Sequence, residues 1–193
     1  MNMVPEVVLA SSSPRRTELL RMLGIAHRVV SVPVNETMIF GDSVPSNVSR
    51  LAREKALAVA SRVTQGLVIG ADTVVVFDNQ IFGKPTDAND AVDMLRKLQG
   101  HVHEVFSGVA VIDAKTLMAR MDYRRVEVKM RKLSDAEIVS YVNTREPLDK
   151  AGAYAIQGVG ARFIEWICGD YYAVVGLPLE LTAHLLIESG YSF

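Results

Sequence analysis

The sequence is poor in cysteine, in long apolar runs and in excess charge of one sign. These absences are typical of a soluble globular protein. Its single cysteine, Cys168, cannot form an internal disulfide, which predicts a reducing compartment such as the cytoplasm. No apolar run approaches the roughly 20 residues of a membrane-spanning helix, and residues 1–5 lack the basic region of a signal peptide. Charge of one sign is not in excess either, because 21 Lys and Arg residues balance 22 Asp and Glu residues. We therefore expect neither a nucleic-acid nor a membrane partner.

Common cofactor and metal motifs are also missing. The four histidines show no metal-ligand spacing, and with one cysteine we expect no structural zinc site. Gly83-Lys84-Pro85 is not a phosphate-binding P-loop, since proline replaces the Ser or Thr. The segment 158–161 lacks the third glycine of a dinucleotide fingerprint. No repeat or flexible linker divides the chain, so we expect one domain over residues 1–193.

Hydrophobic periodicity predicts interleaved strands and helices. We expect strands at 7–9, 27–34, 67–77, 81–82, 101–112 and 117–128, helices at 14–23, about 45–62, 86–99, 134–143 and 178–189, and a mixture of loops and short strands over 148–176. The run from Leu67 to Phe77 is apolar at successive positions, which is typical of a strand buried on both faces. The pattern predicts an α/β fold with a mixed sheet.

The stretch from Ser11 to Arg16 connects the first strand to the first helix. Pro14 suits the first helical position and Ser13 the N-cap. Backbone N–H groups at a helix start attract anions, and the guanidinium groups of Arg15 and Arg16 match phosphate oxygens. The alternative, that these arginines are ordinary surface charge, conflicts with the helix dipole. The stretch therefore indicates a phosphate-binding loop.

Asp72 is a carboxylate in the middle of the expected buried strand, where an unpaired charge is costly. We favour a functional acid here, and the alternatives are a buried salt bridge or a strand that bends to expose the carboxylate. Lys55 lies on the apolar stripe of the expected 45–62 helix, so it either extends to water along that face or meets an anion such as a phosphate. Glu36, at a strand end, reads from position alone as a surface residue. Two acids, several basic groups and a helix start suit a hard cation and a polyphosphate.

Short motifs along nearly the whole chain resemble, in order, those of the Maf family of nucleoside triphosphate pyrophosphatases. They are SSSPRR at 11–16, VNET at 34–37, REKA at 53–56, GADTVV at 70–75, GKP at 83–85, DKAGAYAIQG at 149–158 and VVGLPL at 174–179. The resemblance implies an elongated mixed β-sheet with flanking helices and two lobes around a deep cleft, similar to the inosine triphosphate pyrophosphatases. It implies hydrolysis of the α–β bond of a nucleoside triphosphate, with Mg²⁺ or Mn²⁺, in a protein that is often a homodimer.

The resemblance also assigns residue roles. Asp72 matches the catalytic acid that accepts the proton of water, and Glu36 its partner, with both near the metal. The family's phosphate-binding positions fall on Ser11, Ser12, Ser13, Arg15, Arg16, Lys55 and Lys84. Arg15, Thr73 and Gln157 fall at positions that select the substrate. Asn35 replaces an aspartate found in many members, which puts the metal role of Glu36 in question.

The AYAIQG segment at 153–158 resembles the dTTP/UTP branch of the family. We expect an enzyme that removes dTTP, UTP or modified pyrimidine triphosphates. A 7-methyl-GTP pyrophosphatase is the alternative within the family, and a nucleotide-binding regulator of septum formation is the alternative outside catalysis. Retention of both acids and both lysines favours catalysis.

Overall fold

The computed structural model describes residues 4–193, which form a seven-stranded mixed sheet and its flanking helices. The strand order is β2-β1-β3-β5-β6-β7, and β4 pairs with β3. β1 pairs in parallel with β2 and β3, whereas the β3–β4 and β6–β7 pairs are antiparallel. The predicted α/β class and mixed sheet are confirmed. No helix among the described residues is long and apolar enough to cross a membrane.

The chain divides into two compact units, and β3 (Leu67–Phe77), β5 (Val102–Asp113) and β6 (Ala119–Met130) contribute to both. The first unit contains residues up to Asp72, Ser107–Arg124 and Gly176–Phe193, and the second contains Thr73–Phe106 and Arg125–Val175. The expected single domain over 1–193 stays a prediction.

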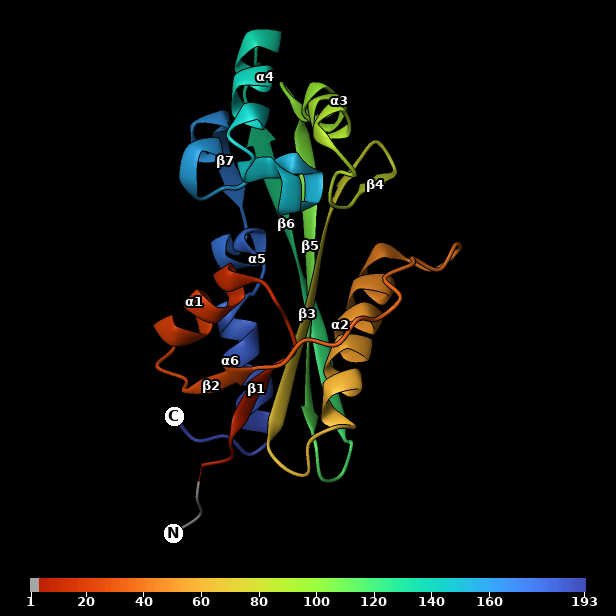
Figure 1. Ribbon diagram of the computed structural model, residues 1–193, viewed down its shortest axis with the longest axis vertical. Helices are drawn as coiled ribbons and strands as arrows, with labels where there is room; N and C mark the ends of the chain where they lie inside the picture. The colour runs from red at the N-terminus through yellow and green to blue at the C-terminus, as the bar shows by residue number, and fades with distance from the viewer. Residues whose placement is uncertain (1–3) are drawn as a thin grey trace. The chain divides into compact units, whose positions relative to one another are not determined.

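The first unit carries α2 on one face of its strands. Its own elements are β1 (Val7–Leu9), α1 (Pro14–Met22), β2 (His27–Val29), α2 (Val44–Ala60) and α6 (Leu179–Glu188). Ala52 and Ala56 of α2 pack with Val8, Val68 and Ala110 in one apolar cluster. Because side chains alternate along a strand, the neighbouring residues face the opposite side, and Figure 1 shows α1 and α6 on the side away from α2.

β2 is shorter than the predicted strand at 27–34. Three residues of β2 pair with β1, and one further backbone bond joins the Val30 N–H to the Leu9 carbonyl. Residues 30–39 form neither helix nor strand. β1 and β3, in contrast, have the predicted bounds.

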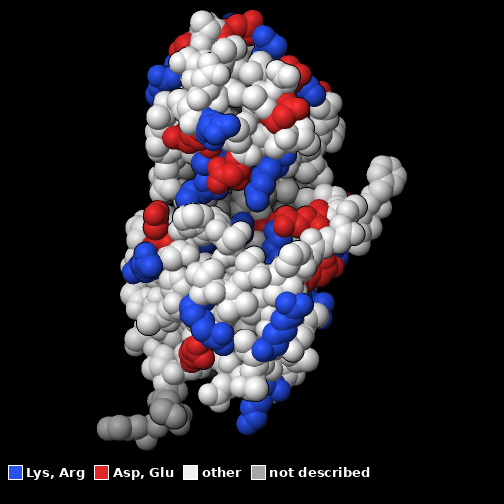
Figure 2. Space-filling view, viewed as in Figure 1, with Lys and Arg blue, Asp and Glu red and all other residues white. Residues whose placement is uncertain are grey.

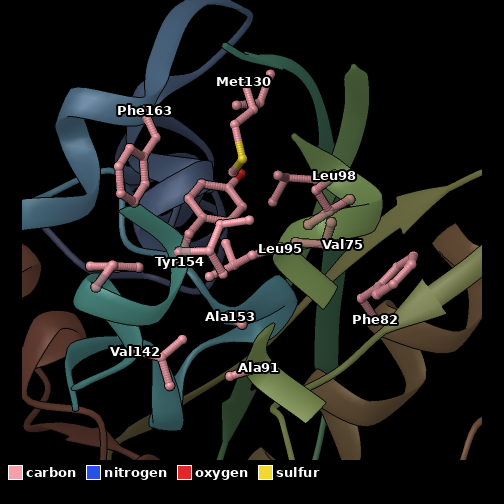
Figure 3. Close-up of a cluster of buried hydrophobic side chains, with 14 of the residues drawn as sticks. Val75, Phe82, Ala91, Leu95, Leu98, Met130, Val142, Ala153, Tyr154 and Phe163 are labelled. Atoms are coloured by element: carbon pink, nitrogen blue, oxygen red, sulfur yellow. The ribbon is translucent and has the colours of Figure 1, made fainter. Parts of the chain in front are cut away.

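The second unit has its own apolar core. Its remaining elements are β4 (Gln80–Phe82), α3 (Ala88–Leu98), α4 (Asp135–Asn143), the 3-10 turns η1 (Glu146–Asp149), η2 (Ala151–Ala153) and η3 (Gly158–Phe163), β7 (Ile164–Cys168) and α5 (Tyr171–Val175). Figure 3 shows Leu98, Met130 and Tyr154 pointing into this core, which α3, the strands and η2 enclose. The helix predicted at 134–143 is confirmed as α4, and Ser134 and Glu137 form a capping box at its start.

The segment 148–176 differs most from the prediction. It contains one strand instead of several, and most of the remainder forms 3-10 turns and the short helix α5. Hydrogen bonds to side chains of α4 and η1 hold the segment in place of the predicted strand pairing.

His103 is buried in the core of the second unit, with its Nε2 2.8 Å from the Tyr154 hydroxyl. Burial lowers the pKa of His103 from 6.5 to about 4. Between pH 6.5 and 4, His103 is therefore protonated in the unfolded chain but largely neutral in the folded chain. The free energy of unfolding falls as the pH drops through this range. At 1.36 kcal/mol per pKa unit, we expect a loss of about 3 kcal/mol from this residue.

Urea unfolding at pH 7, 6, 5 and 4 measures this effect. We expect His103→Gln to be less stable at pH 7 and to lose less stability than the wild type on acidification. Parallel pH profiles for the two proteins would contradict the assignment.

Candidate active site

The predicted serine–arginine loop leads from β1 into α1. Ser11 is buried, and its Oγ accepts hydrogen bonds from the Ser13 N–H at 3.2 Å and from Arg16 Nη1 at 3.1 Å. Ser13 stands at the N-cap as predicted, but its side chain makes no capping bond. The first turn of α1 is therefore not capped by that hydroxyl, which leaves this helix start suited to an external anion.

Arg16 links this loop to the predicted acids. Its Nε donates to the Gly176 carbonyl at 2.9 Å, which fixes the guanidinium group. Burial lowers the pKa of Arg16 below its ordinary value, and the positive charge of Arg15 lowers it further. The negative charges of Asp72 and Glu36 oppose this shift. These charges act on one another only if they are close. In the first unit, Asp72, Glu36 and Arg15 therefore lie within electrostatic range of Arg16.

Asp72, Lys55 and Glu36 form a chain of ion pairs. Lys55 Nζ lies 2.7 Å from Asp72 Oδ1 and 2.9 Å from Glu36 Oε2. The Lys55 and Asp72 side chains are 13% and 7% exposed, whereas that of Glu36 is 56% exposed. Burying an ion pair rarely adds stability over an apolar pair of similar size. The arrangement therefore suggests a role in function for this buried charge.

The structure shows what each of these three side chains contacts. Asp72 does form a buried salt bridge, Lys55 meets anions on its own chain, and Glu36 is exposed as its position indicated. The ammonium group of Lys55, matched by resemblance to a phosphate ligand, lies here between the two carboxylates.

Gly70 allows α2 to reach β3. A Cβ at this position would lie 2.1 Å from the Ala52 carbonyl oxygen and 2.8 Å from the Ala56 nitrogen, both in the backbone of α2. Lys55 is carried by the same turn of the helix, and Asp72 follows two residues after Gly70 on the same face of β3. The absent side chain at Gly70 therefore lets Lys55 meet Asp72.

Three other predicted residues belong to the second unit. Thr73 directly follows Asp72 and is half-buried, and Lys84 is exposed between β4 and α3. Gln157 is half-buried and immediately precedes η3. Within this unit the Gly83 carbonyl accepts a hydrogen bond from the Gly152 N–H at 3.0 Å, which ties the segment carrying Lys84 to the 149–158 segment.

Sequence reasoning missed two residues next to Gln157. Tyr141 and Glu146 hydrogen-bond to each other and to the backbone on both sides of it. Gly158 and Gly160 were the sequence feature that could have indicated this contact. Their spacing does not match a nucleotide-binding fingerprint, but glycines allow the backbone to lie directly against the Tyr141 and Glu146 side chains.

The acids of the first unit fit a divalent cation shared with a substrate. Asp72 Oδ1 and Glu36 Oε2 are at most about 5.6 Å apart, the sum of their distances to Lys55 Nζ. Among residues 4–193 no three His, Cys, Asp or Glu side chains are grouped so that they could hold a metal ion. Mg²⁺ commonly takes one or two carboxylates and completes its shell with water and substrate phosphates. The donor set suits that type of site.

Acidic and basic side chains are interspersed over the face shown in Figure 2. This mixture agrees with the net charge of −1.

Comparison with known proteins establishes the family. The Maf-like protein family model matches residues 6–189, so this chain belongs to the Maf family. Two similar proteins are both named dTTP/UTP pyrophosphatase. The one from Pelotomaculum thermopropionicum is 47% identical over 97% of this chain and 98% of its own length. The one from Dictyoglomus thermophilum is 45% identical over 98% of this chain and 99% of its own length.

A solved structure is also similar. It is that of the Staphylococcus aureus Ham1 protein, with a TM-score of 0.49 and 14% sequence identity, and the match covers 97% of this chain and 91% of that one. The family predicted from the short motifs is confirmed by the family model and the relatives.

Proposed function

We propose that this protein hydrolyses dTTP and UTP to the nucleoside monophosphate and pyrophosphate. The observation that carries the proposal is near-full-length identity of 45–47% to proteins named for that activity. The gathering of Asp72, Lys55, Glu36 and Arg16 around the Ser11 loop supports it, since this set offers a base and cations for a polyphosphate.

In the proposed reaction, Asp72 orients a water molecule and takes its proton. The water oxygen bonds to the α-phosphorus, the bond from that phosphorus to the bridging oxygen breaks, and pyrophosphate leaves with the bonding electrons. Asp72 suits this role because Lys55 holds one of its oxygens in place. Lys55 and Arg16 also reduce the electrostatic cost of bringing a polyanion close to two carboxylates.

The substrate's phosphates are assigned to Ser11, Ser12, Ser13, Arg15, Arg16, Lys55 and Lys84. A divalent cation, Mg²⁺ or Mn²⁺, would be held by Asp72 and Glu36 and would neutralise charge on the triphosphate. Glu36 is the more exposed of the two acids, so it can move toward a cation at little cost. A homodimer and a cytoplasmic location stay predictions.

Pyrophosphate release tests the proposal. We expect turnover of UTP and dTTP with Mg²⁺ or Mn²⁺, slower turnover of CTP and GTP, and loss of turnover when EDTA removes the metal. Turnover of 7-methyl-GTP alone would keep the reaction and overturn the substrate. Nucleotide binding without pyrophosphate release from any substrate would favour the regulator instead.

Gln157, with Arg15 and Thr73, is assigned to substrate selection. A side-chain amide can pair with the edge of a pyrimidine, and a carboxylate at the same place cannot donate. We expect Gln157→Glu to lower the ratio of kcat/KM for UTP over CTP about tenfold or more, with a smaller change in the maximal rate on the best substrate. Steady-state kinetics on both nucleotides measure this ratio, and an unchanged ratio would remove Gln157 from the selecting set.

A further inference from the structure

Tyr141 and Glu146 hold the backbone on both sides of Gln157. The Tyr141 hydroxyl accepts the Ala155 N–H at 3.1 Å and donates to Glu146 Oε1 at 2.8 Å. The other side of Gln157 is held by Glu146, which accepts the N–H groups of Val159 and Gly160, each at 3.0 Å. The pair therefore clamps the segment two residues before and two to three residues after Gln157.

Both side chains of the clamp are themselves fixed. Tyr141 is fully buried, and its ring meets that of Phe163 edge to face, with ring centres 5.0 Å apart. Burial alone would raise the pKa of Glu146, but hydrogen bonds from Gly160, Val159 and Tyr141 and the nearby Lys150 hold it below its ordinary value. Glu146 thus acts as an ionised acceptor, and charge-assisted hydrogen bonds are stronger than neutral ones.

Two glycines make this contact possible. A Cβ at Gly158 would lie 2.5 Å from Glu146 Oε2, and one at Gly160 would lie 2.6 Å from the Tyr141 hydroxyl. Gly158 also has a φ of +77°, a conformation that other residues rarely adopt. The glycine spacing at 158–160 is therefore explained by contact with the clamp.

We propose that the Tyr141–Glu146 clamp positions Gln157 and so sets the discrimination among nucleoside triphosphates. This inference rests on the proposed function and on the selecting role of Gln157. Recognition of a base edge by one amide requires placement to within about half an ångström, which a side chain on a loop reaches only if the loop is held. The clamp touches the backbone around Gln157, so Tyr141 and Glu146 are positioning residues.

Glu146→Gln tests the clamp. Glutamine keeps the shape of the side chain but places a donor where one carboxylate oxygen accepts, so at least one hydrogen bond to the loop is lost. We expect the ratio of kcat/KM for UTP over CTP to fall about tenfold, mainly through a higher KM for UTP, with kcat on UTP within about threefold of the wild type. Tyr141→Phe removes only the hydroxyl, and we expect the same direction of change.

Glu137→Gln is the matched control. Glu137 lies on α4 and also accepts a backbone N–H, from Ser134 at 2.9 Å, but its contacts are with Ser134 and Arg131 and not with the loop. The chemical change is the same and the expected UTP/CTP ratio is that of the wild type. Circular dichroism confirms that each variant is folded at the assay temperature.

The outcomes separate this inference from the proposed function. If Gln157→Glu changes the ratio and neither Glu146→Gln nor Tyr141→Phe does, the clamp is refuted while the function stands. An equal loss of kcat/KM on UTP and CTP in the clamp variants would also refute the clamp. A general loss of structure lowers both values alike and leaves their ratio unchanged. A wild type that releases no pyrophosphate from UTP or dTTP would refute the proposed function and the clamp's role with it.

Discussion

Asp72→Asn is expected to lower kcat for pyrophosphate release from UTP by about 10²–10⁴-fold, the usual contribution of a general base. Asparagine has nearly the same shape as aspartate but cannot take a proton from water. Lys55 keeps Glu36 as an anionic partner at 2.9 Å, so the variant should remain folded. Single-turnover and steady-state pyrophosphate release measure the effect.

A matched control separates loss of the base from loss of charge in general. Asp78 lies in the turn between β3 and β4, is exposed and has a φ of 49°, which asparagine tolerates well. We expect Asp78→Asn to retain wild-type kcat. An Asp72→Asn protein whose kcat stays within tenfold of the wild type would show that another group accepts the proton.

Gly70→Ala is expected to destabilise the protein by about 3 kcal/mol, the upper part of the usual range for overpacking. The added methyl group would meet the Ala52 carbonyl oxygen at 2.1 Å, and that atom is part of the α2 backbone and cannot rotate away. α2 must shift from β3, which also weakens the contact between Lys55 and Asp72. We therefore expect a lower urea midpoint together with a lower kcat.

Gly83→Ala is the control for stability. A Cβ at Gly83 would have no atom within 4 Å, so the substitution should leave the urea midpoint unchanged or slightly higher. A Gly70→Ala protein as stable as the wild type would mean that Gly70 does not set the distance between α2 and β3.

The sequence by itself determined an element wherever its signal lay within a few neighbouring residues, such as a capping pair or an apolar run. The capping residues Ser134 and Glu137 set the start of α4, and the apolar run at 67–77 set both ends of β3. Family membership also followed from short motifs in order, and the family model confirms it. The buried position of Asp72 could be predicted because the residue lies within an apolar strand, and a carboxylate buried there needs a partner.

Tertiary structure decided which partner each polar group found. Helical spacing placed Lys55 on the inner stripe of α2, but only the approach permitted by Gly70 brought it onto Asp72 and Glu36. The length of β2 depended on its pairing with β1, which extends over three residues. In the 148–176 segment, Tyr141 and Glu146 replaced strand pairing with side-chain hydrogen bonds. Such contacts join residues from different elements, so their energies depend on packing distances that no local pattern encodes.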